Sequence, residues 1–283
     1  MRALEFSNKA KDGSNLFFRK WLPEGAIKAV ICIVHGLGDH SGWFSNMSKY
    51  LTNNNFAVVT FDLRGHGKSE GKRGHIPSYE ALMDDIDILI NTAKESFYGL
   101  PVFLFGHSFG GNQVLNYVLR RHPKIAGVMA SAPWLSLYSN PSAFKLYSTF
   151  LFDKIYPTLL VDNVVNEAAL SHKPGLSEEY SKDPLVHSNI SARLFTNAYK
   201  SGLWAVNHAY ELDIPLLIFH GDEDKITSHK ASIAFANNAP KELCTLKIWE
   251  GLYHSLHNEI SNEEIFLDIV NWINAKVLDF ATA

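Results

Sequence analysis

A serine between two glycines is the feature of this chain that is best suited to do chemistry. Ser108 forms the pattern G-x-S-x-G with Gly106 and Gly110. An apolar run at residues 102–106 precedes it, and a helical apolar pattern at residues 113–121 follows it. Where a buried strand turns sharply into a helix, large side chains beside the apex would clash, and the helix N-terminus favours a developing negative charge. This context predicts a nucleophile at Ser108; the alternative is a serine that caps the helix.

A second glycine motif, H-G-x-G, follows an earlier apolar run and spans residues 35–38. When a serine attacks a carbonyl, negative charge develops on the oxygen, and backbone N–H groups aimed at that oxygen stabilise the transition state. We expect the N–H groups of Leu37 and Phe109 to form this oxyanion hole. A plain turn without a catalytic role is the alternative.

Several potential metal ligands surround this motif, but their spacing matches none of the common zinc patterns. The residues concerned are His35, His40, Asp62 and His66. We therefore expect no metal and no cofactor.

A serine nucleophile needs a base to take its proton and an acid to orient that base. The apolar run at residues 215–219 leads into a loop that holds Asp222, Glu223 and Asp224. Asp224 stands three residues after a glycine, where the acid of such a loop usually lies, and it is the predicted acid. Asp222 is the alternative, or else it caps the turn.

The base is expected in the loop after the last apolar run, residues 243–249. His254 lies a few residues past the end of this run, so the loop can place it over the sheet. His257 follows three residues later, and we predict that it contacts the substrate or supports the base.

The elements that must position these residues alternate between apolar runs and helical patterns. The runs are nearly continuous and rich in Val, Ile and Phe, which is typical of strands buried on both faces of a parallel sheet. They span residues 29–34, 56–62, 102–106, 127–131, 215–219 and 243–249. Helical patterns span residues 79–96, 113–121 and 263–277, and a hairpin of strands near residues 4–8 and 16–22 opens the chain.

One connection is too long for a simple crossover between strands. Residues 133–212 separate two predicted strands and show helical patterns at residues 141–153, 163–170 and 190–210. We predict that they form an inserted helical cap, while residues 1–132 and 213–283 form the α/β core. A cap at this position covers the carboxyl ends of the strands, where ligands bind in open α/β sheets.

Composition excludes several classes of function. The chain has 283 residues, of which 46% are hydrophobic and 19% charged, and its net charge is −3. These values indicate a globular protein and disfavour nucleic acid as a partner. No apolar stretch is long enough to cross a bilayer, and the first residues lack the apolar core of a signal peptide, so we expect a cytoplasmic protein.

Four motifs together resemble the monoacylglycerol lipase and lysophospholipase-like serine hydrolases of the α/β-hydrolase superfamily. They are H-G-L-G-D-H-S-G at residues 35–42, F-D-L-R-G-H-G-K-S at 61–69, G-H-S-F-G-G at 106–111 and E-G-L-Y-H-S-L-H at 250–257. The resemblance covers nearly the whole chain. It implies an α/β-hydrolase fold with a mostly parallel central sheet, helices on both faces and a cap. It also implies Ser108, Asp224 and His254 as the triad.

The resemblance further implies an acyl chain under the cap and a head group near the oxyanion loop. The residues expected to contact substrate are His35, Gly36, Asp39, His257, Phe144, Tyr147 and Leu151. Asp39 stands where that family commonly has a glutamate. The apolar side chains of residues 141–157 can line an acyl pocket, rest on a membrane or micelle, or pack on the sheet.

The expected function is hydrolysis of a single-chain lipid ester, a monoacylglycerol or a lysophospholipid, through an acyl-enzyme. Three alternatives stay open: a general short-chain carboxylesterase, a prolyl-type aminopeptidase that uses Glu178, Glu179 or Asp183 to hold a free amine, and a non-catalytic ligand-binding protein. The expected partner is a small lipid ester.

Overall fold

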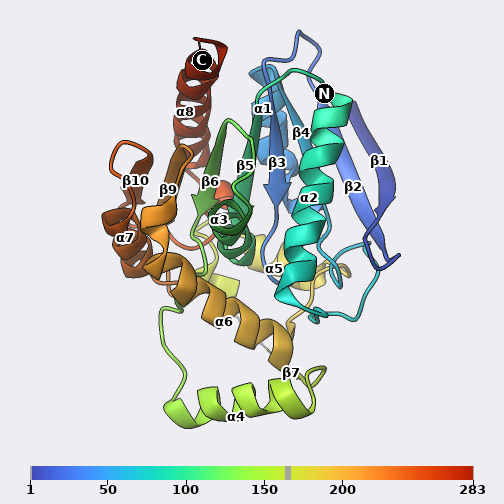
Figure 1. Cartoon of the computed structure of the whole chain (residues 1–283), viewed down its shortest axis with the longest axis vertical. Helices are drawn as coiled ribbons and strands as arrows, with labels where there is room; N and C mark the ends of the chain where they lie inside the picture. Colours follow the sequence, from blue (N-terminus) through green and yellow to red (C-terminus); the bar gives the residue numbers. More distant parts are fainter. Residues whose placement is uncertain (1, 163–166, 283) are drawn as a thin grey trace.

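A computed structural model describes residues 2–162 and 167–282 of the chain, and an eight-stranded sheet lies at its centre (Figure 1). The strand order is β1-β2-β4-β3-β5-β6-β9-β10. Neighbouring strands from β4 to β10 are parallel, whereas β2 is antiparallel to both β1 and β4. The strands are β1 (Arg2–Lys9), β2 (Asn15–Leu22), β3 (Ala29–Val34), β4 (Phe56–Phe61), β5 (Val102–His107), β6 (Gly127–Ser131), β9 (Leu216–Gly221) and β10 (Cys244–Trp249).

The central strands are buried because helices cover both faces of the sheet. Every residue of β3, β4, β5, β6 and β9 is buried. Continuous apolar runs are therefore needed, and the predicted runs agree with the observed strands to within two residues. The predicted α/β fold with its mostly parallel sheet is confirmed.

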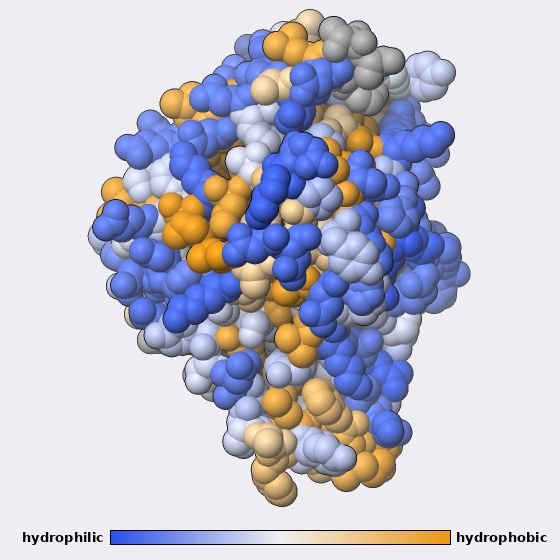
Figure 2. Space-filling view, turned by 60° about the vertical axis from the view of Figure 1, so that its left-hand side comes forward, coloured by the Kyte–Doolittle hydropathy of each residue, from blue (hydrophilic) through white to orange (hydrophobic). Residues whose placement is uncertain are grey.

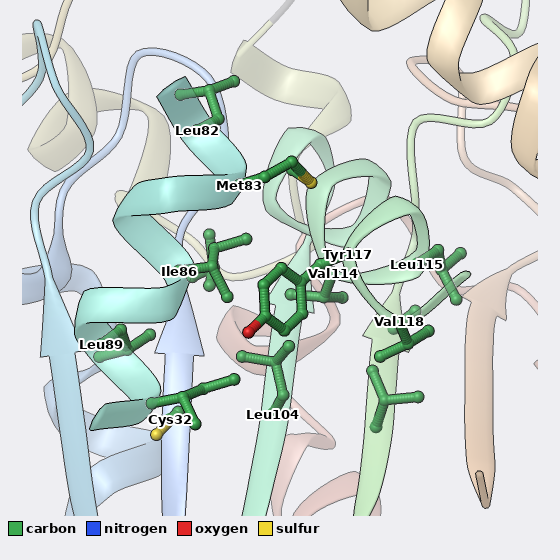
Figure 3. Packing of buried hydrophobic residues seen from close by; sticks show 14 of the residues in the cluster. Cys32, Leu82, Met83, Ile86, Leu89, Leu104, Val114, Leu115, Tyr117 and Val118 are labelled. Atoms are coloured by element: carbon green, nitrogen blue, oxygen red, sulfur yellow. The ribbon is translucent and has the colours of Figure 1, made fainter. Parts of the chain in front are cut away.

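Helices α2 (Tyr79–Ser96), α3 (Phe109–Arg121) and α7 (His229–Asn238) pack on one face of the sheet. Helices α1 (Ser45–Asn53) and α8 (Asn262–Thr282) pack on the other. Figure 3 shows the first layer, in which side chains of α2 and α3 meet residues of the strands beneath them, such as Cys32 and Leu104.

Local signals set some helix ends but not others. The α2 helix has the predicted bounds, and the Ser78 side chain caps it by accepting a hydrogen bond from the N–H of Ala81. By contrast, α3 begins at Phe109, four residues before the predicted start, because the turn after Ser108 enters the helix directly through Gly110 and Gly111. Helices α1 and α7 were not predicted.

The connection between β6 and β9 forms the inserted helical cap. Its elements are α4 (Ala143–Ile155), β7 (Leu160–Asp162), α5 (Leu176–Lys182), β8 (Asn189–Ser191) and α6 (Ala192–Asn207), where β7 and β8 pair antiparallel. In Figure 1, α6 crosses below the carboxyl ends of the strands, and α4 lies beyond it at the far end of the molecule.

The cap differs from its prediction at one expected helix and at three elements that were not predicted, namely α5, β7 and β8. Residues 163–166 of the helix expected at 163–170 lie outside the described residues, and the rest holds only a 3-10 helix, Glu167–Ala169. A short apolar pattern does not distinguish a helix from a turn that packs by tertiary contacts, so the α-helix prediction is wrong for the described part. The α5 helix was not predicted.

Among the helices of residues 2–162 and 167–282, none is both long and apolar enough to cross a bilayer.

Candidate active site

Ser108 lies at the apex of a strained turn between β5 and α3. Its backbone has φ +54° and ψ −114°, a left-handed region that non-glycine residues rarely adopt. A Cβ atom added to Gly106 would lie 2.3 Å from the carbonyl oxygen of Gly110. A Cβ atom added to Gly110 would lie 2.2 Å from the carbonyl oxygen of Val34. The two flanking positions are therefore restricted to glycine, and the strain is maintained by the packing around the turn.

Asp224 lies in the loop that follows β9, and its carboxylate is fully buried. Oδ1 accepts hydrogen bonds from the N–H groups of Ile226 (2.7 Å) and Thr227 (3.0 Å). Burial raises the pKa of Asp224, but the imidazoles of His254 and His220 lower it more, and the net pKa lies well below the ordinary value. The structure thus holds an ionised carboxylate in the protein interior.

His254 follows β10 and contacts this carboxylate directly. Its Nδ1 lies 2.6 Å from Asp224 Oδ2. A carboxylate on Nδ1 fixes the tautomer of the ring and leaves Nε2 free to accept a proton. His254 and Ser108 both line the same cavity. The residues predicted as nucleophile, acid and base therefore converge on one site.

The competing carboxylates of the same loop have other contacts. Asp222 Oδ1 accepts a hydrogen bond from the N–H of Gly251 at 2.7 Å, so this side chain ties its loop to the loop after β10. Glu223 is exposed and pairs with Lys225 at 2.7 Å. Of the three candidates, only Asp224 contacts a histidine that opens into the cavity.

The predicted oxyanion loop passes beside Ser108. Leu37 lines the cavity, and a Cβ on Gly36 would lie 3.3 Å from that of Ser108. Phe109 is the first residue of α3, so its N–H has no helical partner. In the described part of the chain, neither the Leu37 nor the Phe109 N–H donates a hydrogen bond. Both are available to a ligand, as an oxyanion hole requires.

A cavity of about 860 Å³ lies between the core and the cap. The core lines it with the catalytic candidates, Gly36, Leu37 and Asp39, and the cap adds mostly apolar side chains. Those cap residues include Leu137, Leu170, Leu176, Val186 and Phe195. Asp39 is buried, and this burial raises the pKa of its carboxyl well above the ordinary value.

Two histidines predicted to contact substrate do not line this cavity. His35 is fully buried; its Nε2 accepts a hydrogen bond from the N–H of Leu63 at 2.8 Å, and its Nδ1 lies 2.8 Å from the Gly36 carbonyl oxygen. It holds the loop instead. His257 stacks on Phe44 with ring centroids 4.4 Å apart. Burial lowers its pKa to about 3, so it is a neutral member of an aromatic stack.

The three cap residues predicted to bind the acyl chain face solvent. Phe144 is 84% exposed, Tyr147 81% and Leu151 53%. None lines the cavity, and no residue of α4 is buried. Figure 2 shows apolar surface gathered at the lower end of the molecule, where Figure 1 places α4. The prediction that these residues contact the acyl chain is wrong, because α4 packs outside α6 and not over the sheet.

Two histidines near the triad candidates were missed. His220 Nε2 lies 2.9 Å from Asp224 Oδ2, and His107 lines the cavity with its ring 4.8 Å from that of His254. His220 immediately precedes the glycine used to locate Asp224, and this position was the available signal. No group of three or more potential ligands within residues 2–162 and 167–282 is arranged to hold a metal ion.

Comparisons with known proteins show which family and fold this chain is similar to. The family described as serine aminopeptidase S33 matches residues 25–261. An abhydrolase domain-containing protein of Dictyostelium discoideum is 34% identical over 94% of this chain. The matched region is only 28% of the length of that protein. Human monoglyceride lipase is 29% identical over 96% of this chain and 91% of its own length. The crystal structure of Paleococcus ferrophilus monoacylglycerol lipase is 33% identical, with a TM-score of 0.84 over 92% of this chain and 99% of that one.

Proposed function

Because the chain belongs to the serine aminopeptidase S33 family, we propose that it is a serine hydrolase that cleaves esters of single-chain lipids, foremost monoacylglycerols. The resemblance to monoacylglycerol lipases drawn from the motifs is confirmed. The observation that carries the proposal is the 2.6 Å contact between Asp224 and His254 at a cavity that Ser108 also lines, under a cap with apolar side chains.

In the proposed mechanism, Ser108 attacks the ester carbonyl while His254 Nε2 takes the hydroxyl proton. Asp224 keeps the imidazole in this tautomer and stabilises it once it is charged. The N–H groups of Leu37 and Phe109 stabilise the oxyanion, and His254 then protonates the leaving alcohol. Water, activated by the same histidine, releases the fatty acid from Ser108. All of these steps use protein groups and water.

The cavity suits a single-chain lipid with a small head group. Its volume of about 860 Å³ lies within the usual range for small-molecule sites, roughly 300–1,000 Å³. The apolar lining from the cap offers contacts to an acyl chain. Asp39 is the one carboxyl among the described lining residues, and its raised pKa favours the neutral acid, which donates and accepts hydrogen bonds to hydroxyl groups.

Aminopeptidase activity is less well supported, although the family description names it. A free amine requires an ionised carboxylate in the cavity. Glu178 is exposed and pairs with Lys182, Glu179 is exposed, and Asp183 Oδ2 lies 2.9 Å from His40 Nε2. None of the three lines the cavity.

We also propose that α4 rests on a membrane or micelle surface. Its exposed apolar residues Phe144, Tyr147, Leu151 and Ile155 are spaced three to four positions apart, so they form one stripe along the helix. A stripe of this kind on a cap places the cavity next to the surface that holds the lipid substrate.

The test is hydrolysis of monoacylglycerols, a lysophospholipid and p-nitrophenyl esters from two to eighteen carbons, with Ser108→Ala as the control. A rate maximum on medium or long monoacylglycerols that disappears in Ser108→Ala supports the proposal. A maximum at two to four carbons with little activity on glycerides identifies a general esterase. Activity that survives Ser108→Ala refutes the mechanism.

A further inference from the structure

We propose that His220 is a positioning residue that acts on the base through Asp224, so that the acid is held by two imidazoles. This inference rests on the proposed function, because it assigns a role within the same triad. It names a residue outside the cavity lining that controls the chemistry inside the cavity.

The geometry joins four side chains in one buried row. Ser232 Oγ lies 2.8 Å from His220 Nδ1, and His220 Nε2 lies 2.9 Å from Asp224 Oδ2. The same carboxylate oxygen lies 2.6 Å from His254 Nδ1. Ser232, His220 and Asp224 are fully buried, and His254 is 3% exposed. Thr227 Oγ1, at 2.8 Å, adds a further contact to Oδ2.

The protonation of His220 follows from its two partners. Burial lowers the pKa of His220, so the ring is neutral and carries one proton. The ionised Asp224 can only accept, so that proton must sit on Nε2. Nδ1 then accepts the hydroxyl proton of Ser232. The row therefore has a single consistent direction of donation, from Ser232 to His220 and from His220 to Asp224.

The other ionisable groups around this row do not replace His220. The rings of His107 and His254 lie 4.8 Å apart, and those of His220 and His229 lie 6.4 Å apart. His257 faces His254 from the loop beyond β10 and, like His107, has a pKa lowered by burial. Lys225 lines the cavity, and its ammonium pairs with Glu223 at 2.7 Å and does not contact Asp224. Among the histidines that the structure describes, only His220 and His254 place ring nitrogens on Asp224.

This arrangement has a functional consequence. The His220 N–H withdraws negative charge from Asp224 Oδ2, so the carboxylate favours the charged form of His254 less strongly. The same hydrogen bond holds Oδ2 in the direction of His254 Nδ1. Loss of the His220 N–H should therefore raise the pKa of His254 and also loosen the base. The binding of substrate should be unaffected, because His220 does not line the cavity.

The experiment compares His220→Phe, His220→Gln and Ser232→Ala with the wild type. His220→Phe removes the donor, His220→Gln retains an amide N–H, and Ser232→Ala removes the partner that orients the ring. Ser228→Ala is the matched control, because Ser228 is the N-cap residue of α7, the helix that contains Ser232, and its side chain makes no cap hydrogen bond. The measurements are the pH profile of kcat/KM, KM itself, and the NMR titration of the His254 ring.

For His220→Phe we expect the acid limb of the profile and the His254 titration to move up by about 1 pH unit, with a loss of about tenfold in kcat and little change in KM. Ser232→Ala should move the titration in the same direction by less, His220→Gln should lie near the wild type, and Ser228→Ala should match it. An unchanged His254 titration in both His220→Phe and Ser232→Ala would overturn the proposal.

Two further results are also decisive. If His220→Phe does not fold, the titration of His254 in Ser232→Ala decides alone. If the wild type shows no ester hydrolysis that depends on Ser108, the proposed function fails, while the NMR titration still tests the action of His220 on His254. The two proposals can thus fail separately.

Discussion

The exposed stripe on α4 gives a prediction whose size follows from the structure. Phe144 is 84% exposed, Tyr147 81% and Ile155 70%. We expect the triple variant Phe144→Ser, Tyr147→Ser and Ile155→Ser to fold normally, because no residue of α4 is buried. Its binding to lipid vesicles should be weakened strongly.

The expected loss comes from apolar area that the membrane would otherwise cover. Full burial of a large apolar side chain contributes about 1.5–3 kcal/mol. If insertion covers about half of each of the three side chains, the total is roughly 2–4 kcal/mol. Because 1.4 kcal/mol corresponds to a factor of ten, the variant should partition into vesicles roughly 30- to 700-fold less well.

The assay is co-sedimentation with phosphatidylcholine vesicles, together with hydrolysis of a monoacylglycerol in the same vesicles and of a water-soluble p-nitrophenyl ester. Vesicle binding and vesicle hydrolysis should fall together, whereas hydrolysis of the soluble ester should stay near the wild-type rate. Tyr98→Ser is the matched control, since Tyr98 is 96% exposed but lies before the amino end of β5, whereas the cap lies at the carboxyl ends of the strands. Binding within about threefold of the wild type, or an equal loss in Tyr98→Ser, would refute the reasoning.

Three further predictions concern the site. Asp224→Asn should lower kcat by roughly 10³–10⁴-fold, because the amide no longer fixes the tautomer of His254; steady-state kinetics on a soluble ester measure this. Gly38→Ala should abolish most activity and lower the melting temperature, since Gly38 has φ +76° and its added Cβ would lie 2.2 Å from the His187 carbonyl oxygen. Asp39→Asn should stabilise the protein at pH 8 but not at pH 4, as thermal unfolding at both pH values will show. The pKa of Asp39 is raised in the folded state. The stability that this group contributes is therefore present below its pKa in the unfolded chain and is lost as the pH rises through its pKa in the folded protein.

Each of these variants has a control that separates the stated cause from a general effect. Glu223→Gln changes an exposed neighbour of Asp224 and should leave kcat unchanged. Gly99→Ala also places alanine at a positive φ, +79°, but in open space, so it should retain activity. Asp213→Asn changes a half-exposed side chain that pairs with His122. Relative to the wild type, it should not stabilise the protein at either pH. Equal effects in a variant and its control would contradict the corresponding explanation.

The sequence specified the elements whose signals are local or continuous. Strands buried on both faces require uninterrupted apolar runs, and so the runs that flank Ser108 and precede Asp224 could be located to within two residues. The Gly106–Ser108–Gly110 spacing also has a local cause, because the backbone of the turn excludes any Cβ at the two glycines. The order of serine, acid and histidine followed from the loops after successive strands.

Contacts between distant parts of the chain were decided only by the tertiary structure. Whether an apolar helix faces inward or outward depends on what packs over it, and α4 lies outside α6, so Phe144 and Tyr147 are exposed and do not line the cavity. Likewise, His257 is placed in a stack by Phe44, which is more than 200 positions away in the chain. Apolar periodicity shows that a side chain prefers to leave water, but only the fold determines whether a core, a cavity or a membrane surface receives it.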